Sequence, residues 1–162
     1  MSRTPFLRRF RVITLVAVLG SPSNAMAGER LEGPVAAIVE RVVDGDTLAV
    51  RAKIWIGQEI VVLVRLRGID APELRGDCPG EIAQAKGAAA ALATIVGAGP
   101  VTLHRIEGDK YFGRVVADVA IPRGDLGDMM LRSGQARPYR GDARAPWCEA
   151  DIVVGDGGRA LR

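Results

Sequence analysis

Five short runs rich in β-branched residues, interrupted by one alanine-rich stretch, restrict most strongly the fold that this chain can adopt. The runs occupy residues 34–43, 47–54, 59–67, 101–106 and 115–121. β-branched residues in runs of this length are typical of strands. Asp-Gly-Asp at residues 44–46 and Ile-Gly-Gln at residues 56–58 separate the first three runs. These turn signals predict an antiparallel meander of three strands.

The alanine-rich stretch predicts a helix over residues 79–96, between the third and fourth strands. Pro79 suits the first helical position, and Gly97 can end the helix. Two shorter helical segments are expected at residues 125–133 and from Trp147 onward. Five strands with a helix between the third and fourth are the element order of an OB-fold. The sequence therefore predicts a mainly β fold with α, a five-stranded OB-fold barrel with about three helices.

The first 27 residues differ from the rest in composition. Four arginines precede the apolar run VITLVAVLG, and Ala25-Met26-Ala27 supplies the small residues that signal peptidase recognises. A short membrane anchor is the alternative, but nine apolar residues fall far below the roughly 20 that span a bilayer. We predict a signal peptide at residues 1–27 and one domain at residues 28–162. The protein is thus expected to be exported, periplasmic or secreted, with no stable membrane association after cleavage.

Removal of this segment changes the charge balance. Without its four arginines, 18 of the 22 basic residues remain against 19 acidic residues. The basic isoelectric point of the whole chain is therefore no argument for a nucleic-acid partner, and any such argument depends on where the charges lie.

The two cysteines, Cys78 and Cys148, are an even pair in a chain that is expected to reach an oxidising compartment. We predict a disulfide between them, with two free thiols as the alternative. Their position outside the motifs described below predicts that reduction affects stability more than activity.

Several catalytic arrangements are hard to build from this sequence. After residue 27 the chain holds one histidine, His104, and one serine, Ser133. A Ser-His-Asp triad, a two-histidine ribonuclease site and a histidine-based zinc site are therefore disfavoured. If the chain is an enzyme, its chemistry depends on carboxylates, arginines and a hard metal ion.

Three polar segments can supply such a site: VDGDT at residues 43–47, RLRGIDAPE at residues 65–73 and DKYFGR at residues 109–114. Each segment alone also fits an ordinary turn. Asp-Gly is a favoured hairpin dipeptide, proline ends a strand, and the third segment is a polar connection between two strands.

Taken together, the three segments favour a site. In the predicted meander Asp46 starts the second strand and Asp70 ends the third, so the two carboxylates can approach each other and suit a hard cation such as calcium. Arg65 and Arg67 alternate with apolar residues, and a guanidinium group matches a pair of phosphate oxygens. Glu73 can then hold an attacking water near the metal.

These segments, in this order and followed by RSGQARPY and PWC, resemble the thermonuclease family, the staphylococcal nuclease-like enzymes. The resemblance covers about residues 34–147. It implies an OB-fold and a calcium-dependent nuclease that hydrolyses phosphodiester bonds in DNA and RNA with little sequence preference. The chain departs from the family pattern at Ala71, where the best-known member has threonine. The DKYFGR segment also carries one residue more than the usual DKYGR.

The resemblance also implies roles for individual residues. The implied metal ligands are Asp46, Asp70 and the backbone carbonyl of Ala71. The implied catalytic residues are Arg65, Glu73 and Arg114, with Glu73 as general base or water-orienting group and the arginines as a clamp on the phosphate. The implied substrate-binding residues are Lys110, Tyr111 and Tyr139. Because of the extra residue, Phe112 is an alternative to Tyr111 for stacking on the nucleotide.

A monomeric nuclease is thus the expected function, with DNA and RNA as substrates. A noncatalytic OB-fold module that binds single strands is the alternative. Such a module needs basic and aromatic side chains but has no use for Glu73 beside two aspartates and two arginines. An exported scaffold without a nucleic-acid role accounts for none of the three segments.

Overall fold

The computed structural model describes residues 29–148 of the 162-residue chain. The predicted signal peptide at residues 1–27 lies outside this range, as do Gly28 and residues 149–162. The domain boundary after residue 27 therefore stays a prediction. Neither helix within residues 29–148 is long and apolar enough to cross a membrane.

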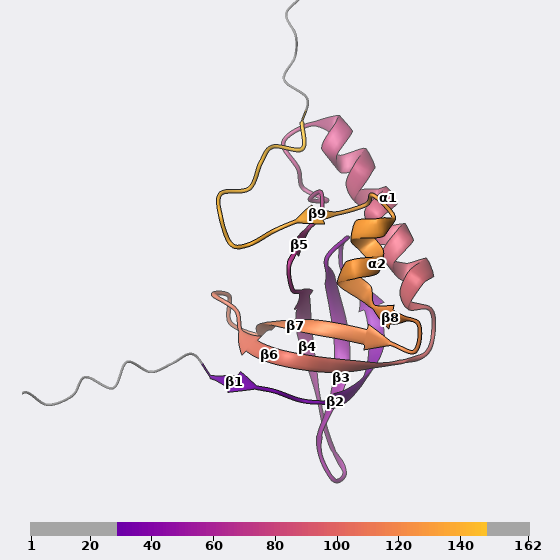
Figure 1. Ribbon diagram of the computed structural model, residues 1–162, viewed down its shortest axis with the longest axis vertical. Coiled ribbons are helices and arrows are strands. Elements are labelled where there is room, and N and C mark those ends of the chain that lie inside the picture. Colours follow the sequence, from indigo (N-terminus) through magenta and orange to yellow (C-terminus); the bar gives the residue numbers. More distant parts are fainter. Residues whose placement is uncertain (1–28, 149–162) are drawn as a thin grey trace, which may run out of the picture.

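A closed five-stranded barrel forms the centre of the fold (Figure 1). Its strands are β2 (Val35–Val42), β3 (Thr47–Trp55), β4 (Gln58–Leu66), β6 (Pro100–Gly108) and β7 (Arg114–Ile121). The first three form an antiparallel meander, β4 pairs in parallel with β7, and β6 pairs with β7 and β2 to close the barrel. This is the strand arrangement of an OB-fold, so the predicted fold class is confirmed.

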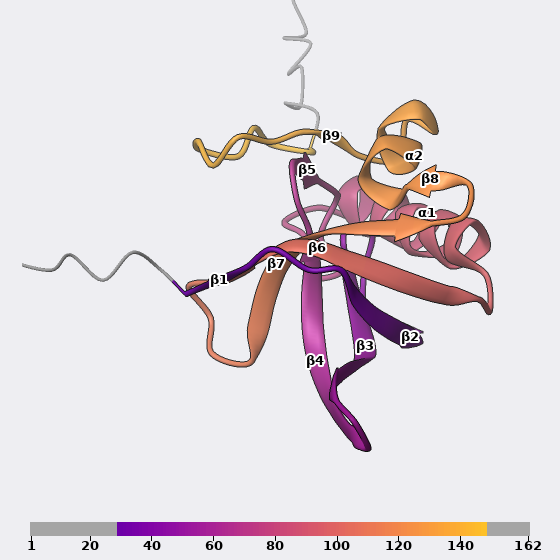
Figure 2. The ribbon, with the colours of Figure 1, turned by 60° about the horizontal axis from the view of Figure 1, so that its bottom comes forward.

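The core lies at one end of the β3–β4 hairpin. In β3, Leu48, Val50 and Ala52 alternate toward the barrel interior and are buried, and in β4 the burial is confined to the last residues, Val64 to Leu66. The opposite end of the hairpin extends away from the barrel (Figure 2). Because the two strands are antiparallel, the start of β3 and the end of β4 meet in the buried half. Polar residues at those two positions are therefore drawn into the core.

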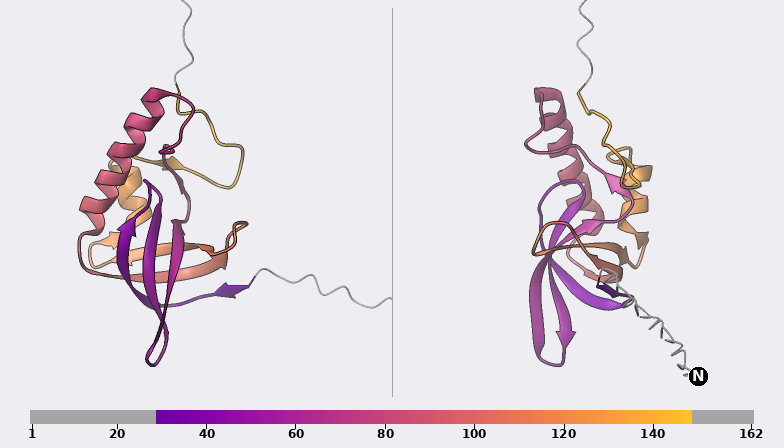
Figure 3. Two further views of the ribbon diagram at one scale, coloured as in Figure 1. Left: turned by 180° about the vertical axis from the view of Figure 1, so that it is seen from behind. Right: turned by 90° about the vertical axis from the view of Figure 1, so that its left-hand side faces the viewer.

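Two helices lie together on one side of the barrel (Figure 3). They are α1 (Pro79–Val96) and α2 (Leu126–Arg132). Helix α1 begins at Pro79, as the sequence predicts, and buries side chains at a spacing of three or four residues, namely Ala85, Ala88, Leu92 and Val96. The prediction of about three helices is too high for residues 29–148. Trp147 and Cys148 are not helical, and the rest of the expected third helix lies outside the described residues.

Four strands of two residues each were not predicted. They are β1 (Arg30–Leu31), β5 (Ile69–Asp70), β8 (Gly124–Asp125) and β9 (Arg137–Pro138). Strand β5 pairs with β9, which places Asp70 opposite Arg137. A two-residue strand carries no periodic sequence pattern, so pairs of this kind are invisible before the chain folds. This pairing brings the segment after α2 to the end of β4.

A disulfide joins Cys78 to Cys148, as predicted. Cys78 is the N-cap residue of α1, and its sulfur accepts a hydrogen bond from the backbone N–H of Glu81. Cys148 follows Trp147, whose indole donates to Asp70. The disulfide thus lies closer to the polar segments than the sequence suggested, and it ties the chain after β9 to the start of α1.

The paired replacement Cys78→Ser and Cys148→Ser is expected to lower the free energy of unfolding by about 4 kcal/mol, because the bridge closes a loop of 70 residues. Serine is a good N-cap residue, so position 78 keeps an acceptor for Glu81 and the loss reports on the cross-link. Urea unfolding of the variant and of the oxidised wild type measures the difference. Equal stability of the two proteins would show that the bridge contributes nothing.

Candidate active site

The VDGDT turn is fixed by close contact with its surroundings. The side chain of Asp44 accepts a hydrogen bond from the backbone N–H of Asp46 at 3.0 Å. A Cβ at Gly45 would lie only 2.6 Å from the side chain of Ala88 and 2.7 Å from that of Ala71, so this position needs glycine. The turn is therefore wedged between α1 and the segment after β5, with Asp46 beside Ala71.

Asp46 is buried and fully hydrogen-bonded. Its Oδ1 accepts from Arg65 Nη1 at 2.7 Å and from the Thr47 hydroxyl at 2.9 Å, and its Oδ2 accepts from the Ala71 N–H at 3.2 Å. Thr47 and Arg65 are directly opposite each other in the β3–β4 ladder, which explains why Arg65 reaches Asp46. Burial raises the pKa of Asp46 to about 7, although the positive charge of Arg65 acts in the opposite direction.

Asp70, at the end of β5, is 1% exposed and surrounded by donors. Its Oδ2 accepts from Arg137 Nη2 and from the Trp147 indole N–H, each at 3.1 Å. The other oxygen, Oδ1, lies 3.5 Å from Arg65 Nη2 and 3.1 Å from Arg144 Nε, yet within residues 29–148 no group donates a hydrogen bond to it. Arg65 thus bridges the two aspartates that the sequence predicts as a pair.

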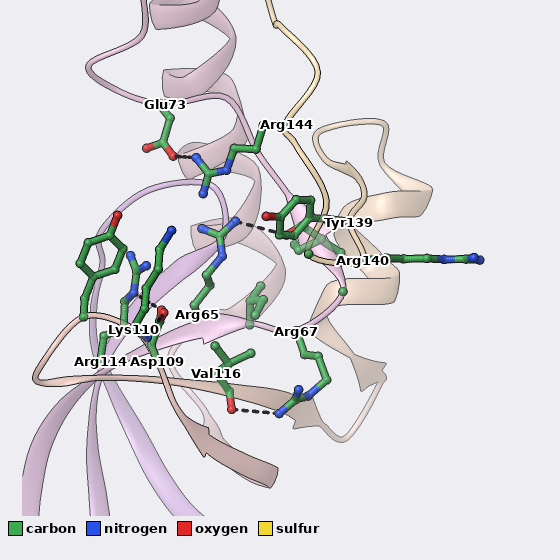
Figure 4. Close-up of a pocket in the computed structure, with 15 residues that line it drawn as sticks. Arg65, Arg67, Glu73, Asp109, Lys110, Arg114, Val116, Tyr139, Arg140 and Arg144 are labelled. Atoms are coloured by element: carbon green, nitrogen blue, oxygen red, sulfur yellow. Dashed lines mark hydrogen bonds and ion pairs between the residues drawn. The ribbon is translucent and has the colours of Figure 1, made fainter. Parts of the chain in front are cut away.

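Glu73 lies at the surface of the site. Its side chain is 45% exposed, and its carboxylate forms an ion pair with Arg144 (Figure 4). Arg144 also contacts Asp70, so this one guanidinium group connects the two carboxylates. Within the described residues, the carboxylate oxygens of Glu73, Asp46 and Asp70 do not lie close enough together to form a three-ligand metal site.

The turn between β6 and β7 supplies a second cationic group. Arg114 Nε lies 2.5 Å from Asp109 Oδ2, and the guanidinium carbon lies 4.6 Å from the centre of the Tyr111 ring. The Lys110 ammonium lies 5.1 Å from the same ring. Phe112, by contrast, is fully exposed. The structure therefore associates Tyr111, and not Phe112, with the predicted phosphate-binding arginine.

These groups line one pocket of about 950 Å³ (Figure 4). The cationic lining residues are Arg65, Arg67, Lys110, Arg114, Arg140 and Arg144. The acidic lining residues are Glu73 and Asp109, and two tyrosines, Tyr111 and Tyr139, also contribute. The pocket therefore carries a clear excess of positive charge, which suits a polyanion. Asp46 and Asp70 lie behind Arg65 and are not part of the lining.

Most of the predicted site residues come together. Arg65, Glu73, Arg114, Lys110, Tyr111 and Tyr139 line the pocket, and Asp46 and Asp70 meet at Arg65. Ala71 is buried next to Asp46 through its N–H. Sequence reasoning missed Arg137, Arg144 and Trp147. The predicted disulfide was one indirect signal for Trp147. It joins Cys148 to the start of α1, which places the neighbouring Trp147 near Glu73.

A second group of potential metal ligands lies at the disulfide. The sulfurs of Cys78 and Cys148 and a carboxylate oxygen of Glu81 lie within 4.8 Å of one another. The sulfurs are bonded to each other, so neither is a thiolate that can hold a metal.

Comparison with known proteins places the chain in a family. The model of the family described as staphylococcal nuclease homologue matches residues 63–151. The matched segment includes Arg65, Asp70, Glu73 and Arg114, whereas the turn that carries Asp46 precedes it. No curated protein matches the sequence. Since the match spans more than half of the chain and the barrel has the expected strand order, the chain belongs to the staphylococcal nuclease homologue family.

Proposed function

We propose that this protein is a calcium-dependent nuclease that hydrolyses phosphodiester bonds in DNA and RNA with little sequence preference. One observation carries the proposal. Arg65 joins two buried carboxylates, Asp46 and Asp70, and also lines a cationic pocket that contains Glu73. A binding module gains nothing from burying two carboxylates behind a phosphate-binding groove, since buried charges are costly unless they serve a site.

The side chains of Asp46 and Asp70 are of the kind that binds a hard cation. Both are carboxylates, which calcium prefers as ligands, and Asp70 Oδ1 is buried without a hydrogen-bond donor in the described part of the chain. Burial raises the pKa of Asp46, and a bound cation would favour its charged form. We propose Asp46, Asp70 and the carbonyl of Ala71 as the ligands. When bound, calcium would neutralise charge on the scissile phosphate.

The side chains of the pocket supply the other parts of the reaction. Arg65 and Arg114 bind the phosphate oxygens and stabilise the charge that develops in the transition state. Glu73 accepts a proton from the attacking water. In the structure Glu73 is paired with Arg144, whose side chain is 40% exposed. A phosphate in the pocket offers Arg144 another anionic partner, so substrate binding favours release of Glu73.

Three other pocket residues bind the nucleotide. Lys110 contributes charge, and the exposed ring of Tyr111 offers a face for a base. Tyr139 lines the same pocket and lies across it from Lys110 (Figure 4). Stacking on an aromatic ring accepts any base, which supports the proposed lack of sequence preference.

We also propose that the protein is exported, to the periplasm or beyond the cell, and acts as a monomer. The disulfide supports an oxidising compartment. The proposed metal ligands and catalytic residues all come from one chain, so the site needs no second copy.

Cleavage is expected to require calcium. Single-stranded DNA and RNA are incubated with the mature protein in calcium and in excess chelator, and cleavage products are separated on a gel. Chelation should abolish cleavage and added calcium should restore it, because two buried carboxylates, one with an oxygen that accepts no hydrogen bond within residues 29–148, form the proposed ligand set. Full activity in chelator would exclude the metal. Binding of strands without cleavage under any divalent cation would instead favour the noncatalytic module.

A further inference from the structure

Glu81, in the first turn of α1, directs its carboxylate into the chain segment that carries Glu73. The residue is only 7% exposed. Its Oε1 accepts a hydrogen bond from the backbone N–H of Glu73 at 3.2 Å, and its Oε2 accepts one from the backbone N–H of Asp77 at 3.1 Å. A buried carboxylate of α1 therefore holds both ends of the segment from Glu73 to Asp77.

This arrangement goes beyond ordinary helix capping. A glutamate at the third helical position usually reaches back to the N–H of the N-cap residue. Here the N-cap residue is Cys78, and its sulfur accepts from the N–H of Glu81. The side chain of Glu81 passes over Cys78 to Asp77 and extends as far as Glu73, eight residues earlier. Glu81 thus has a connection to the site that capping does not require.

Gly76 provides independent support. A Cβ at this position would lie 2.4 to 2.5 Å from three side-chain atoms of Glu81, including Oε2. Gly76 is not among the glycines with a positive φ, so its backbone does not require glycine. Its N–H donates to the carbonyl of Glu73 at 2.9 Å, which closes the turn around the carboxylate. The space at Gly76 is what lets Glu81 enter the segment.

The connection matters because the side chain of Glu73 has little support of its own. Its carboxylate contacts the exposed Arg144 at the pocket. Its direction therefore depends on its backbone, which Asp70 in β5 fixes on one side and Glu81 on the other. Misplacement of a reacting group by about 1 Å can cost on the order of 100-fold in rate.

We propose that Glu81 is a positioning residue for hydrolysis, which holds the backbone of Glu73 at the pocket. The proposal rests on the function proposed above. It assigns a role to a side chain that touches neither the pocket nor the two buried aspartates.

The first test is Glu81→Gln. Glutamine offers one acceptor oxygen in place of two, so one of the two N–H groups loses its partner. At saturating oligonucleotide, kcat is expected to fall by about 10- to 100-fold, with the Kd for the oligonucleotide unchanged within about twofold.

Gly76→Ala is a second test that leaves Glu81 chemically intact. The added methyl group displaces the carboxylate, so the variant should lose as much kcat as Glu81→Gln. Gly80→Ala is the matched control in the same region, because the nearest atom to its Cβ is the Cys78 sulfur at 4.0 Å. The control should retain the kcat of the wild type. If Glu81→Gln does not fold, Gly76→Ala still decides the outcome.

Two further measurements separate positioning from stability alone. In a Glu73→Gln background, Glu81→Gln should cost no further activity, because the group that it positions no longer acts. Amide hydrogen exchange at Glu73 and Asp77 should be slow in the wild type and at least about 10-fold faster in Glu81→Gln and Gly76→Ala.

Equal losses in both backgrounds, or unchanged exchange at Glu73, would overturn the proposal. A wild-type protein that never cleaves overturns the proposed function instead. Hydrogen exchange would still report whether Glu81 anchors the segment, so the two failures are distinguishable.

Discussion

Glu73→Gln is expected to lower kcat for DNA and RNA at least about 100-fold, since a general base contributes typically 10²- to 10⁴-fold. Glutamine keeps the size of the side chain but cannot take the proton from water. Affinity for the strand should change little, because Glu73 is an acid in a cationic pocket and does not bind phosphate. Single-turnover cleavage and oligonucleotide binding, measured separately, give the two quantities.

Glu59→Gln is the matched control for this variant. Glu59 is also an exposed glutamate, but it lies on the β4 strand of the hairpin and contacts only Arg51, at 4.0 Å, among the described ion-pair partners. It should retain full activity and stability. If Glu73→Gln cleaves at the wild-type rate, Glu73 is not the base and the proposed mechanism is wrong.

Arg65→Ala is expected to reduce both stability and activity. Arg65 is 9% exposed and joins Asp46 to Asp70, so its removal leaves two buried carboxylates without this cation. Breaking a buried ion pair in this way typically costs 3–5 kcal/mol. Loss of one preorganised group that stabilises transition-state charge costs about 10²- to 10³-fold in kcat. Chemical unfolding and single-turnover cleavage measure the two effects.

Arg65→Lys separates charge from geometry. Lysine keeps the positive charge but lacks the planar fork with which Arg65 reaches two carboxylates at once. We expect activity close to that of the alanine variant, with a smaller loss of stability. Wild-type turnover in Arg65→Lys would mean that charge alone suffices at this position.

Arg51→Lys is the control for the replacement of a guanidinium group by an ammonium group. Arg51 also contacts two carboxylates, those of Glu40 and Glu59, but its side chain is 47% exposed. Surface ion pairs contribute about 0–1 kcal/mol, so this variant should behave as the wild type. The contrast between the two arginines then shows whether the replacement is costly only at the buried site.

Much of the barrel was predictable from local sequence patterns. The alternation in β3 and the Asp-Gly turn before it predict a hairpin, and Pro79 with Gly97 marks both ends of α1. The approach of Asp46 to Asp70 was predicted with Asp70 at the end of the third strand, but β4 ends at Leu66 and Asp70 lies in β5. The ladder places Arg65 opposite Thr47, and Arg65 then links the two aspartates. These features depend on residues close in sequence or on one regular ladder.

The immediate surroundings of the two aspartates depended on the tertiary structure. Trp147 donates to Asp70 across 77 positions, and Arg137 and Arg144 reach the same carboxylate from the chain after α2. None of these residues lies in a periodic segment. Their positions follow from a two-residue strand pair and a disulfide, and neither constraint specifies side-chain contacts before the core has formed.

The sequence by itself thus determined the strand order, the main helix, the partnership of the two cysteines and six of the residues that line the pocket. Only the tertiary structure decided that Glu73 is paired with Arg144 and anchored by Glu81. The physical reason is the range of the interactions. Strand and helix formation is encoded in the period of neighbouring residues, whereas hydrogen bonds to a buried carboxylate depend on which distant donors the packed core brings within reach.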